Sequence, residues 1–378
     1  MGKNNFQLSK SVSDSKRNKT LASAENEYDL MVFSHLRWNF VYQRPQHLIS
    51  RISRHYKILF IEEPIADEIE DGYELNIIHK NLHVFKPRVK DMEAIPSVLL
   101  AFLQSTQVEY AWFYSPSFSS LLAYIDVNFI IYDCMDELSL FKGAPAELIE
   151  QEKFLISEAD IVFTGGKSLY ESKSQRHPNT FCFPSSVERE HFEKARYHLS
   201  LPEDLKHIPS LIVGYCGVID ERIDMDLLQN TALLLPGVSF VMIGPLAKID
   251  DSELARAPNI FYLGMKSYES LPQYLAAFNI AMMPFALNDS TKYISPTKTL
   301  EYMAAGKPII STAIKDVERD YSHCIPIIST AEEFAAAIKE LLNTNNQEYQ
   351  QDYNKILDRT SWDNTANSMI QILKETVK

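Results

Sequence analysis

Five residues near position 300 have the types and spacing needed to bind a charged ligand. The tripeptide Ser295-Pro296-Thr297 is a helix-start signal, and Lys298 adds a full positive charge to the first turn. A helix N-terminus exposes unpaired N–H groups and a partial charge of about +0.5, so it favours anions. Glu301 follows on the same face, where its carboxylate can accept hydrogen bonds from a sugar diol. The segment predicts an anion-binding site, and the alternative is an ordinary helix start with a surface Lys–Glu pair.

A second candidate segment is VGYCGVIDERIDMDL, residues 213–227. Gly217 stands where an apolar strand ends, and a glycine there lets a ligand approach the backbone closely. Arg222 follows in the next loop, and its planar guanidinium can hold a phosphate through two hydrogen bonds. The alternative is a solvated loop arginine.

The first half of the chain carries a polar and aromatic loop, RWNFVYQRPQHL, after its first predicted strand. Trp38 can stack on the apolar face of a sugar, and Asn39, Gln43 and Arg44 can bind hydroxyl or phosphate groups. Asp136 follows another predicted strand end and is a candidate catalytic or acceptor-binding acid. The alternatives are core aromatics with a helix cap for the loop, and a second cap for Asp136.

Short apolar runs that alternate with helical periodicity must position these residues. Runs such as DLMVFS and KILFIE predict buried strands of a mostly parallel sheet with helices on both faces. The pattern breaks at LPEDLKHIP, residues 201–209, and then resumes. We therefore predict an α/β protein made of two Rossmann-like domains that face each other across a ligand cleft. The predicted parts are a disordered tail over 1–26, a first domain over 27–208, a second domain over 209–357, and a helix over 358–378 that returns to the first domain.

TKTLEYMAAGKPIIST, with the upstream MIGPL and SLPQYLAAFNIAMMPF, resembles the donor-binding region of the GT-B glycosyltransferases, in particular the large retaining group called family four or group 1. The resemblance implies that Glu301 binds the ribose of a nucleotide sugar, and that Arg222 and Lys298 neutralise its diphosphate. Tyr293 stands where that group has a second glutamate, which contacts the donor sugar, so the identity of the sugar is left open.

RWNFVYQRPQHL, DCMDE and PSSVEREHF are similar to landmarks of a subgroup that builds bacterial surface polysaccharides. The expected function is transfer of a sugar from a UDP or GDP sugar to a saccharide or lipid-linked acceptor, with retention of configuration implied by the resemblance. A non-hydrolysing sugar-nucleotide epimerase and a non-catalytic nucleotide-sugar-binding protein are the alternatives. The site residues expected to act in catalysis are Arg222, Lys298 and Asp136; for the donor, Gly217, Pro296, Thr297, Glu301 and Tyr293; for the acceptor, Trp38, Asn39, Gln43 and Arg44.

Composition excludes several other classes. The formal net charge of −13 over 378 residues argues against nucleic acid as a partner. The four cysteines are scattered, and no His/Asp/Cys cluster has ligand spacing, so we expect neither a metal nor another cofactor. Without a long apolar stretch or a signal peptide, a cytoplasmic location is expected. The basic tail offers a weak peripheral contact with the inner face of the membrane as an alternative to a solvated tail.

Overall fold

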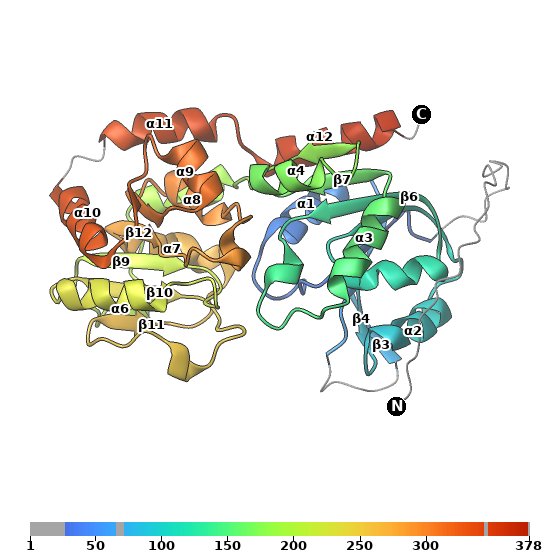
Figure 1. Cartoon of the computed structure of the whole chain (residues 1–378), viewed down its shortest axis with the longest axis horizontal. Helices are drawn as coiled ribbons and strands as arrows, with labels where there is room; N and C mark the ends of the chain where they lie inside the picture. Colours follow the sequence, from blue (N-terminus) through green and yellow to red (C-terminus); the bar gives the residue numbers. More distant parts are fainter. Residues whose placement is uncertain (1–26, 66–71, 344–346, 377–378) are drawn as a thin grey trace.

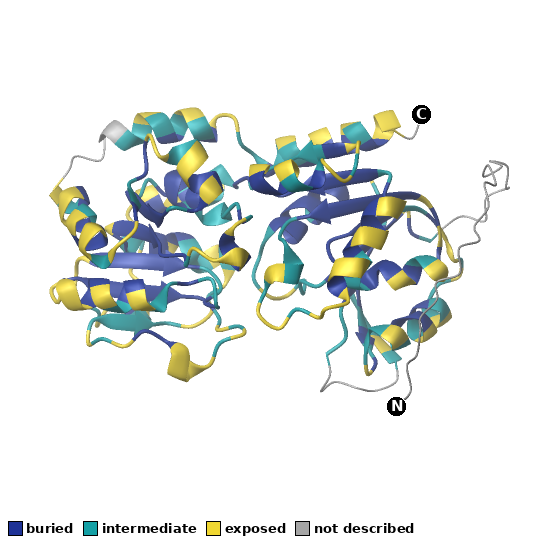
Figure 2. Ribbon diagram, viewed as in Figure 1, coloured by how far each residue is buried: buried dark blue, intermediate teal, exposed yellow. Residues whose placement is uncertain are grey.

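A computed structural model describes residues 27–65, 72–343 and 347–376, which form two α/β units side by side along the long axis (Figure 1). The predicted tail over 1–26 lies outside the described residues. The strands are buried between layers of helices, whose outer faces carry the exposed residues (Figure 2). The predicted α/β fold class, with two Rossmann-like units, is confirmed.

The first unit has an eight-stranded sheet in the order β3-β4-β2-β1-β5-β6-β7-β8, parallel except for the edge pair β3–β4. Side chains alternate between its faces, as the pleat requires. Met31 and Phe33 join the core on one face, whereas Leu30 and Val32 join the core on the other. The strands are β1 (Leu30–Ser34), β2 (Ile58–Glu62), β3 (Gly72–His79), β4 (Leu82–Arg88), β5 (Gln107–Phe113), β6 (Asp126–Cys134), β7 (Ile161–Thr164) and β8 (Thr180–Cys182).

The second unit has a six-stranded, fully parallel sheet in the order β11-β10-β9-β12-β13-β14. Both faces are covered, which explains the unbroken apolar runs in its strands. A single large core spans the unit. The strands are β9 (Ile212–Cys216), β10 (Ser239–Ile243), β11 (Ile260–Tyr262), β12 (Ile280–Met283), β13 (Ile309–Thr312) and β14 (Ile327–Ile328).

Helices cover the sheets of both units. Those of the first unit are α1 (Arg44–Ile52), α2 (Ile95–Phe102), α3 (Leu148–Glu158) and α4 (Lys167–Lys173). Those of the second unit are α5 (Arg189–Glu193), α6 (Met225–Leu234), α7 (Leu271–Ala277), α8 (Thr297–Ala304), α9 (Lys315–Tyr321), α10 (Ala331–Asn343) and α11 (Gln347–Leu357). The last helix, α12 (Trp362–Thr376), packs on α1 over the first unit (Figure 1).

The chain passes between the units twice. Val187, Phe192 and Leu205 already belong to the core of the second unit, so the first passage precedes the predicted linker at 201–209 and the predicted boundary at 208 is too late. The segment looks like an open connection because charged residues surround its few apolar side chains, yet Leu205 is buried and Ile208 packs against the core of the second unit. The second passage lies between Leu357 in the second core and Trp362 in the first.

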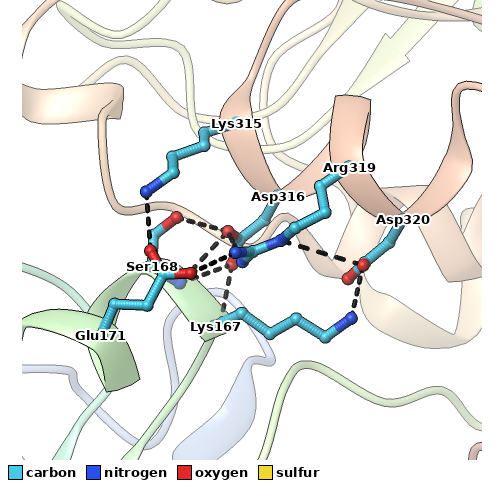
Figure 3. A network of polar contacts seen from close by, with 7 residues as sticks. All are labelled: Lys167, Ser168, Glu171, Lys315, Asp316, Arg319 and Asp320. Carbon is cyan, nitrogen blue, oxygen red and sulfur yellow. Dashed lines mark hydrogen bonds and ion pairs between the residues drawn. The ribbon is translucent and has the colours of Figure 1, made fainter. Parts of the chain in front are cut away.

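A polar network joins α4 of the first unit to α9 of the second (Figure 3). The buried carboxylate of Asp316 accepts hydrogen bonds from the backbone N–H groups of Lys167 and Ser168, at 2.9 and 3.2 Å. Arg319 bridges Asp316 and Glu171, at 2.7 and 2.5 Å. A carboxylate of one unit therefore caps a helix of the other.

None of the helices in the described ranges is long and apolar enough to cross a membrane.

Replacing Asp316 with Asn should weaken this joint, because an amide carries no charge for Arg319 and its N–H₂ group cannot accept from the helix. We expect the free energy of unfolding to fall by about 1–2 kcal/mol, the usual size of a lost helix cap. Chemical denaturation would measure it, and small-angle scattering should show a larger radius of gyration. Glu318→Gln, an exposed change on the same helix, is the control. Equal stability and equal size of the two variants would show that the network does not hold the units together.

Candidate functional site between the two units

A cavity lies between the carboxyl ends of the two sheets and is lined by both units. The first unit contributes Tyr42, Gln43 and Asp136, and the second contributes the loops after β9 and β10 and the start of α8. Ligands of doubly wound folds bind at the carboxyl ends of strands. The cavity is therefore the candidate site.

Two glycines form the floor of the cavity at the ends of β9 and β10. A Cβ on Gly244 would lie 1.8 Å from the carbonyl oxygen of Gly217, and a Cβ on Gly217 would lie 1.9 Å from Cε of Lys298. Both have positive φ angles, +148° and +156°, which side-chain-bearing residues rarely adopt. Gly217 was predicted to line the site, and the structure adds Gly244. The glycines leave the space that the Lys298 side chain occupies.

Helix α8 begins at the cavity wall. Its first residue is Thr297, one position earlier than the predicted start, and Pro296 precedes it without a side-chain cap. Pro296, Thr297, Lys298 and Glu301 all line the cavity. The first N–H groups of α8 are thus open to a ligand, as an anion site requires.

Lys298 and Glu301 bring opposite charges to the same wall. Burial lowers the pKa of the Lys298 ammonium, with Arg222 acting in the same direction, although the Glu301 carboxylate opposes them. Burial raises the pKa of Glu301 to about 7, against the opposing pull of Lys298. Both shifts show that the two groups lack full solvation, so a ligand that pairs with them gains more than it would in water.

Arg222 is held in place by its neighbour two residues earlier. Asp220 accepts from Nε at 3.0 Å and from Nη2 at 2.6 Å, and it is only 5% exposed. Within the part of the chain that the structure describes, Nη1 of Arg222 has no hydrogen-bond partner. The guanidinium can therefore offer N–H groups to a ligand while it keeps its orientation.

Asp136 faces this cationic wall from the first unit. It follows β6 and lines the cavity. Burial raises the pKa of its carboxyl group, whereas Arg222 and Lys298 lower it. The structure thus brings Asp136, predicted from sequence alone, to the same cavity as the predicted cations.

The predicted acceptor loop is only partly at the cavity. Gln43 and Arg44 line it, but Trp38 packs on Phe60 with ring centroids 5.1 Å apart, and Asn39 is exposed outside it. The guanidinium of Arg44 is buried against Asp133, with Nη2 and Oδ1 2.9 Å apart, and also donates to the carbonyl of Phe183 at 2.7 Å. Asp133 and Phe183 are far from Arg44 in the sequence, so residue spacing could not show that they would bind its guanidinium.

Tyr293 does not line the cavity. It is half-buried against the hydrophobic core of the first unit, and its ring lies under the ammonium of Lys292 at 5.4 Å. An aromatic side chain gains more from this apolar contact than the glutamate it replaces in the motif would. The structure therefore separates Tyr293 from the other predicted donor residues.

Sequence analysis did not include Tyr268 and Lys266, which also line the cavity. Tyr268 stacks on Tyr42 of the first unit with ring centroids 4.6 Å apart and donates to Glu188 at 2.8 Å. Lys266 pairs with Asp204 at 2.7 Å. The signal that could have revealed them is Gly264, whose φ of +67° marks a turn after β11, at the same edge as Gly217 and Gly244.

No group of three or more His, Cys, Asp or Glu side chains suited to a metal occurs among the residues that the structure describes.

Comparison with known proteins identifies the second unit. The model of the family "Glycosyl transferases group 1" matches residues 210–344, which contain β9, β10 and α8. Residues 210–344 therefore carry a group 1 glycosyltransferase domain, and the chain as a whole has the GT-B fold. The glycosyltransferase is 23% identical over 268 residues to TuaH of Bacillus subtilis (strain 168), a protein assigned by name to teichuronic acid biosynthesis, with 66% of this chain and 67% of that protein covered.

Solved structures share the whole fold. The E. coli trehalose-6-phosphate structure bound with UDP-2-fluoro glucose matches with a TM-score of 0.66 at 12% identity, covering 91% of the glycosyltransferase and 98% of that chain. HepE of Anabaena in complex with UDP and glucose matches with a TM-score of 0.65 at 12% identity, covering 92% and 99%. The predicted GT-B architecture is confirmed.

Replacing Gly244 with Ala should destabilise the glycosyltransferase strongly, because the added methyl group would collide with the backbone of Gly217. We expect the free energy of unfolding to fall by more than about 2 kcal/mol. Gly237→Ala is the matched control, since a Cβ there meets nothing within 4 Å. Denaturant titration of both variants measures the difference. A Gly244→Ala protein as stable as the control would show that the two strand ends are not packed this closely.

Proposed function

We propose that this glycosyltransferase transfers a sugar from a nucleoside diphosphate sugar to a saccharide or lipid-linked acceptor during assembly of a cell-surface polysaccharide. The observation that carries the donor half is the cavity wall made by Arg222, Lys298 and the open N-terminus of α8, with the carboxylate of Glu301 one turn deeper. Cations and N–H groups suit a diphosphate, and a carboxylate suits a ribose diol.

UDP is the donor nucleotide that the comparisons favour. Two structural neighbours are complexes whose names include UDP-2-fluoro glucose, or UDP and glucose. Gly217 at the end of β9 supports a phosphate-bearing ligand, because it leaves the space in which the cationic side chain of Lys298 reaches the cavity. GDP is the alternative that the first experiment separates.

The chemical step breaks the bond between the anomeric carbon and the diphosphate oxygen and forms a bond from that carbon to an acceptor hydroxyl. Negative charge grows on the departing diphosphate, and Arg222, Lys298 and the α8 N-terminus stabilise it more in the transition state than in the ground state. The proton of the acceptor hydroxyl passes to the departing nucleoside diphosphate or to water. We propose retention of anomeric configuration, in line with the retaining family resemblance.

The acceptor enters from the first unit in this proposal. Asp136 faces the donor wall and can orient an acceptor or donor hydroxyl, and Gln43 lines the same side. Trp38 and Asn39 are not assigned to the acceptor, because Trp38 is packed on Phe60 and Asn39 lies outside the cavity. Arg44 lines the cavity, but its guanidinium is held by Asp133, so we give it no direct role with the acceptor. The assignment to surface polysaccharide rests on the likeness to TuaH.

Thermal unfolding with UDP, GDP and ADP tests the donor assignment. One nucleotide at a hundred times its dissociation constant should stabilise the protein by about 2.7 kcal/mol, and a Glu301→Ala variant should lose most of that gain. Lys298→Ala should reduce turnover by about 10²–10³, the usual cost of one lost transition-state donor. An unchanged midpoint with all three nucleotides would contradict the donor site, and turnover within threefold of wild type in Lys298→Ala would remove Lys298 from catalysis.

Nucleotide affinity should also depend on pH through Glu301. Its pKa of about 7 is raised, so the carboxyl group is mostly protonated at pH 6 and mostly ionised at pH 8. Because the ionised form accepts both ribose hydroxyls, affinity should increase with rising pH, by about tenfold over this window. Calorimetric titrations of wild type and Glu301→Gln at both pH values measure it. The variant corrects for ionisation of the nucleotide phosphate, and an equal pH slope in both proteins would exclude Glu301 as the cause.

A further inference from the structure

A loop of the first unit crosses the cleft and contacts the donor side. It follows the short 3₁₀ helix Leu138–Leu140. The backbone N–H of Lys142 donates to Oε1 of Glu221 at 3.1 Å, and its ammonium pairs with Glu253 at 3.2 Å. These contacts fix the position of Phe141 next to the loop that carries Arg222.

The ring of Phe141 lies against two cations of the second unit. Cζ of Arg222 is 5.2 Å from the ring centroid, and Nζ of Lys248 is 4.4 Å from it. Both distances fall within the roughly 6 Å over which an aromatic face attracts a cation. Lys248 reaches this position from a left-handed backbone, with φ of +60°, which costs free energy in a residue with a side chain. Such a conformation persists only where surrounding contacts hold it.

Arg222 is therefore fixed in two ways. Asp220, from its own loop, binds Nε and Nη2 in the plane of the guanidinium, and Phe141, from the other unit, contacts it through the ring. Rotation about the Arg222 side chain would break at least one of these contacts. The nitrogen left over, Nη1, is the one that can serve a ligand in the cavity.

We propose that Phe141 is a positioning residue that holds the Arg222 guanidinium toward the diphosphate, and that it does so only when the two units are together. The proposal rests on the proposed function, which assigns Arg222 to the diphosphate. Phe141 belongs to the first unit and Arg222 to the second. The orientation of Arg222 toward the diphosphate therefore depends on contact between the two units. If Phe141 only filled space, a leucine of similar size could replace it, whereas a cation–π contact requires an aromatic ring.

Calorimetric titration of UDP and UMP into full-length variants tests the proposal, with GDP and GMP used instead if thermal unfolding favours guanosine. Phe141→Leu keeps an apolar side chain but removes the aromatic face, whereas Phe141→Tyr keeps the face. In Phe141→Leu, the Kd for the diphosphate should rise about three- to tenfold, the size of a partly desolvated cation–π contact, while the Kd for the monophosphate changes less than about twofold. Phe141→Tyr should bind both nucleotides like the wild type.

Two reference variants separate the possible failures. Phe154→Leu makes the same change at an exposed phenylalanine of α3, away from the cavity, and should alter neither affinity. Arg222→Ala should weaken diphosphate binding more than Phe141→Leu does. Equal losses of both nucleotides in Phe141→Leu, or a loss that Tyr does not restore, would overturn the positioning role. Normal diphosphate binding in Phe141→Leu, together with a loss in Arg222→Ala, would overturn the role of Phe141 but leave the assignment of Arg222 to the diphosphate intact. Normal binding in Arg222→Ala would overturn the diphosphate assignment, and this proposal with it.

Discussion

The close packing of two strand ends is the constraint on which the donor side depends. Gly244 touches the backbone of Gly217, and the missing side chain of Gly217 leaves the space in which Lys298 lies. A lysine placed there is poorly solvated, which is why burial lowers its pKa. Keeping a poorly solvated charge costs free energy, and pairing with a bound anion would offset that cost. The glycines thus do more than admit a ligand, because they also create a cation that needs one.

The two units meet through contacts of different kinds on either side of this cavity. On one side, Asp316 of the second unit caps α4 of the first. On the other, Tyr268 of the second unit stacks on Tyr42 of the first with centroids 4.6 Å apart, and His47 of the first unit meets it edge-on with centroids 5.5 Å apart. Burial lowers the pKa of His47 well below its usual range, so the imidazole is neutral in this aromatic group. Capping and stacking are directional, so they fix an orientation between the units as well as their contact.

Local pattern predicted the parallel strands and brought together the residues of the cationic cavity wall, because both depend on residues close in sequence. Gly217 and Arg222 lie in one loop, and Lys298 and Glu301 lie one turn apart on one helix. The edge pair β3–β4 was missed because β3 is largely exposed and lacks a continuous apolar run. The sequence gave no sign that Arg44 pairs with Asp133, because the two residues are far apart in the chain. Phe141 gave no signal, since its contact appears only when the other unit faces it, and for Tyr268 the signal was the nearby Gly264 rather than the tyrosine itself.

Charge balance across the cleft explains why the acceptor side carries the acid. Arg222 and Lys266 each form a salt bridge within the second unit, with Asp220 and Asp204. Lys298 forms no salt bridge among the residues that the structure describes, and its strongest acidic influence is Glu301. Asp136, across the cavity, feels Arg222 and Lys298 as opposite charges. In the proposed function, a bound diphosphate would pair with the same cations and leave Asp136 to interact with a hydroxyl group, so the donor would prepare the other side of the cavity for the acceptor.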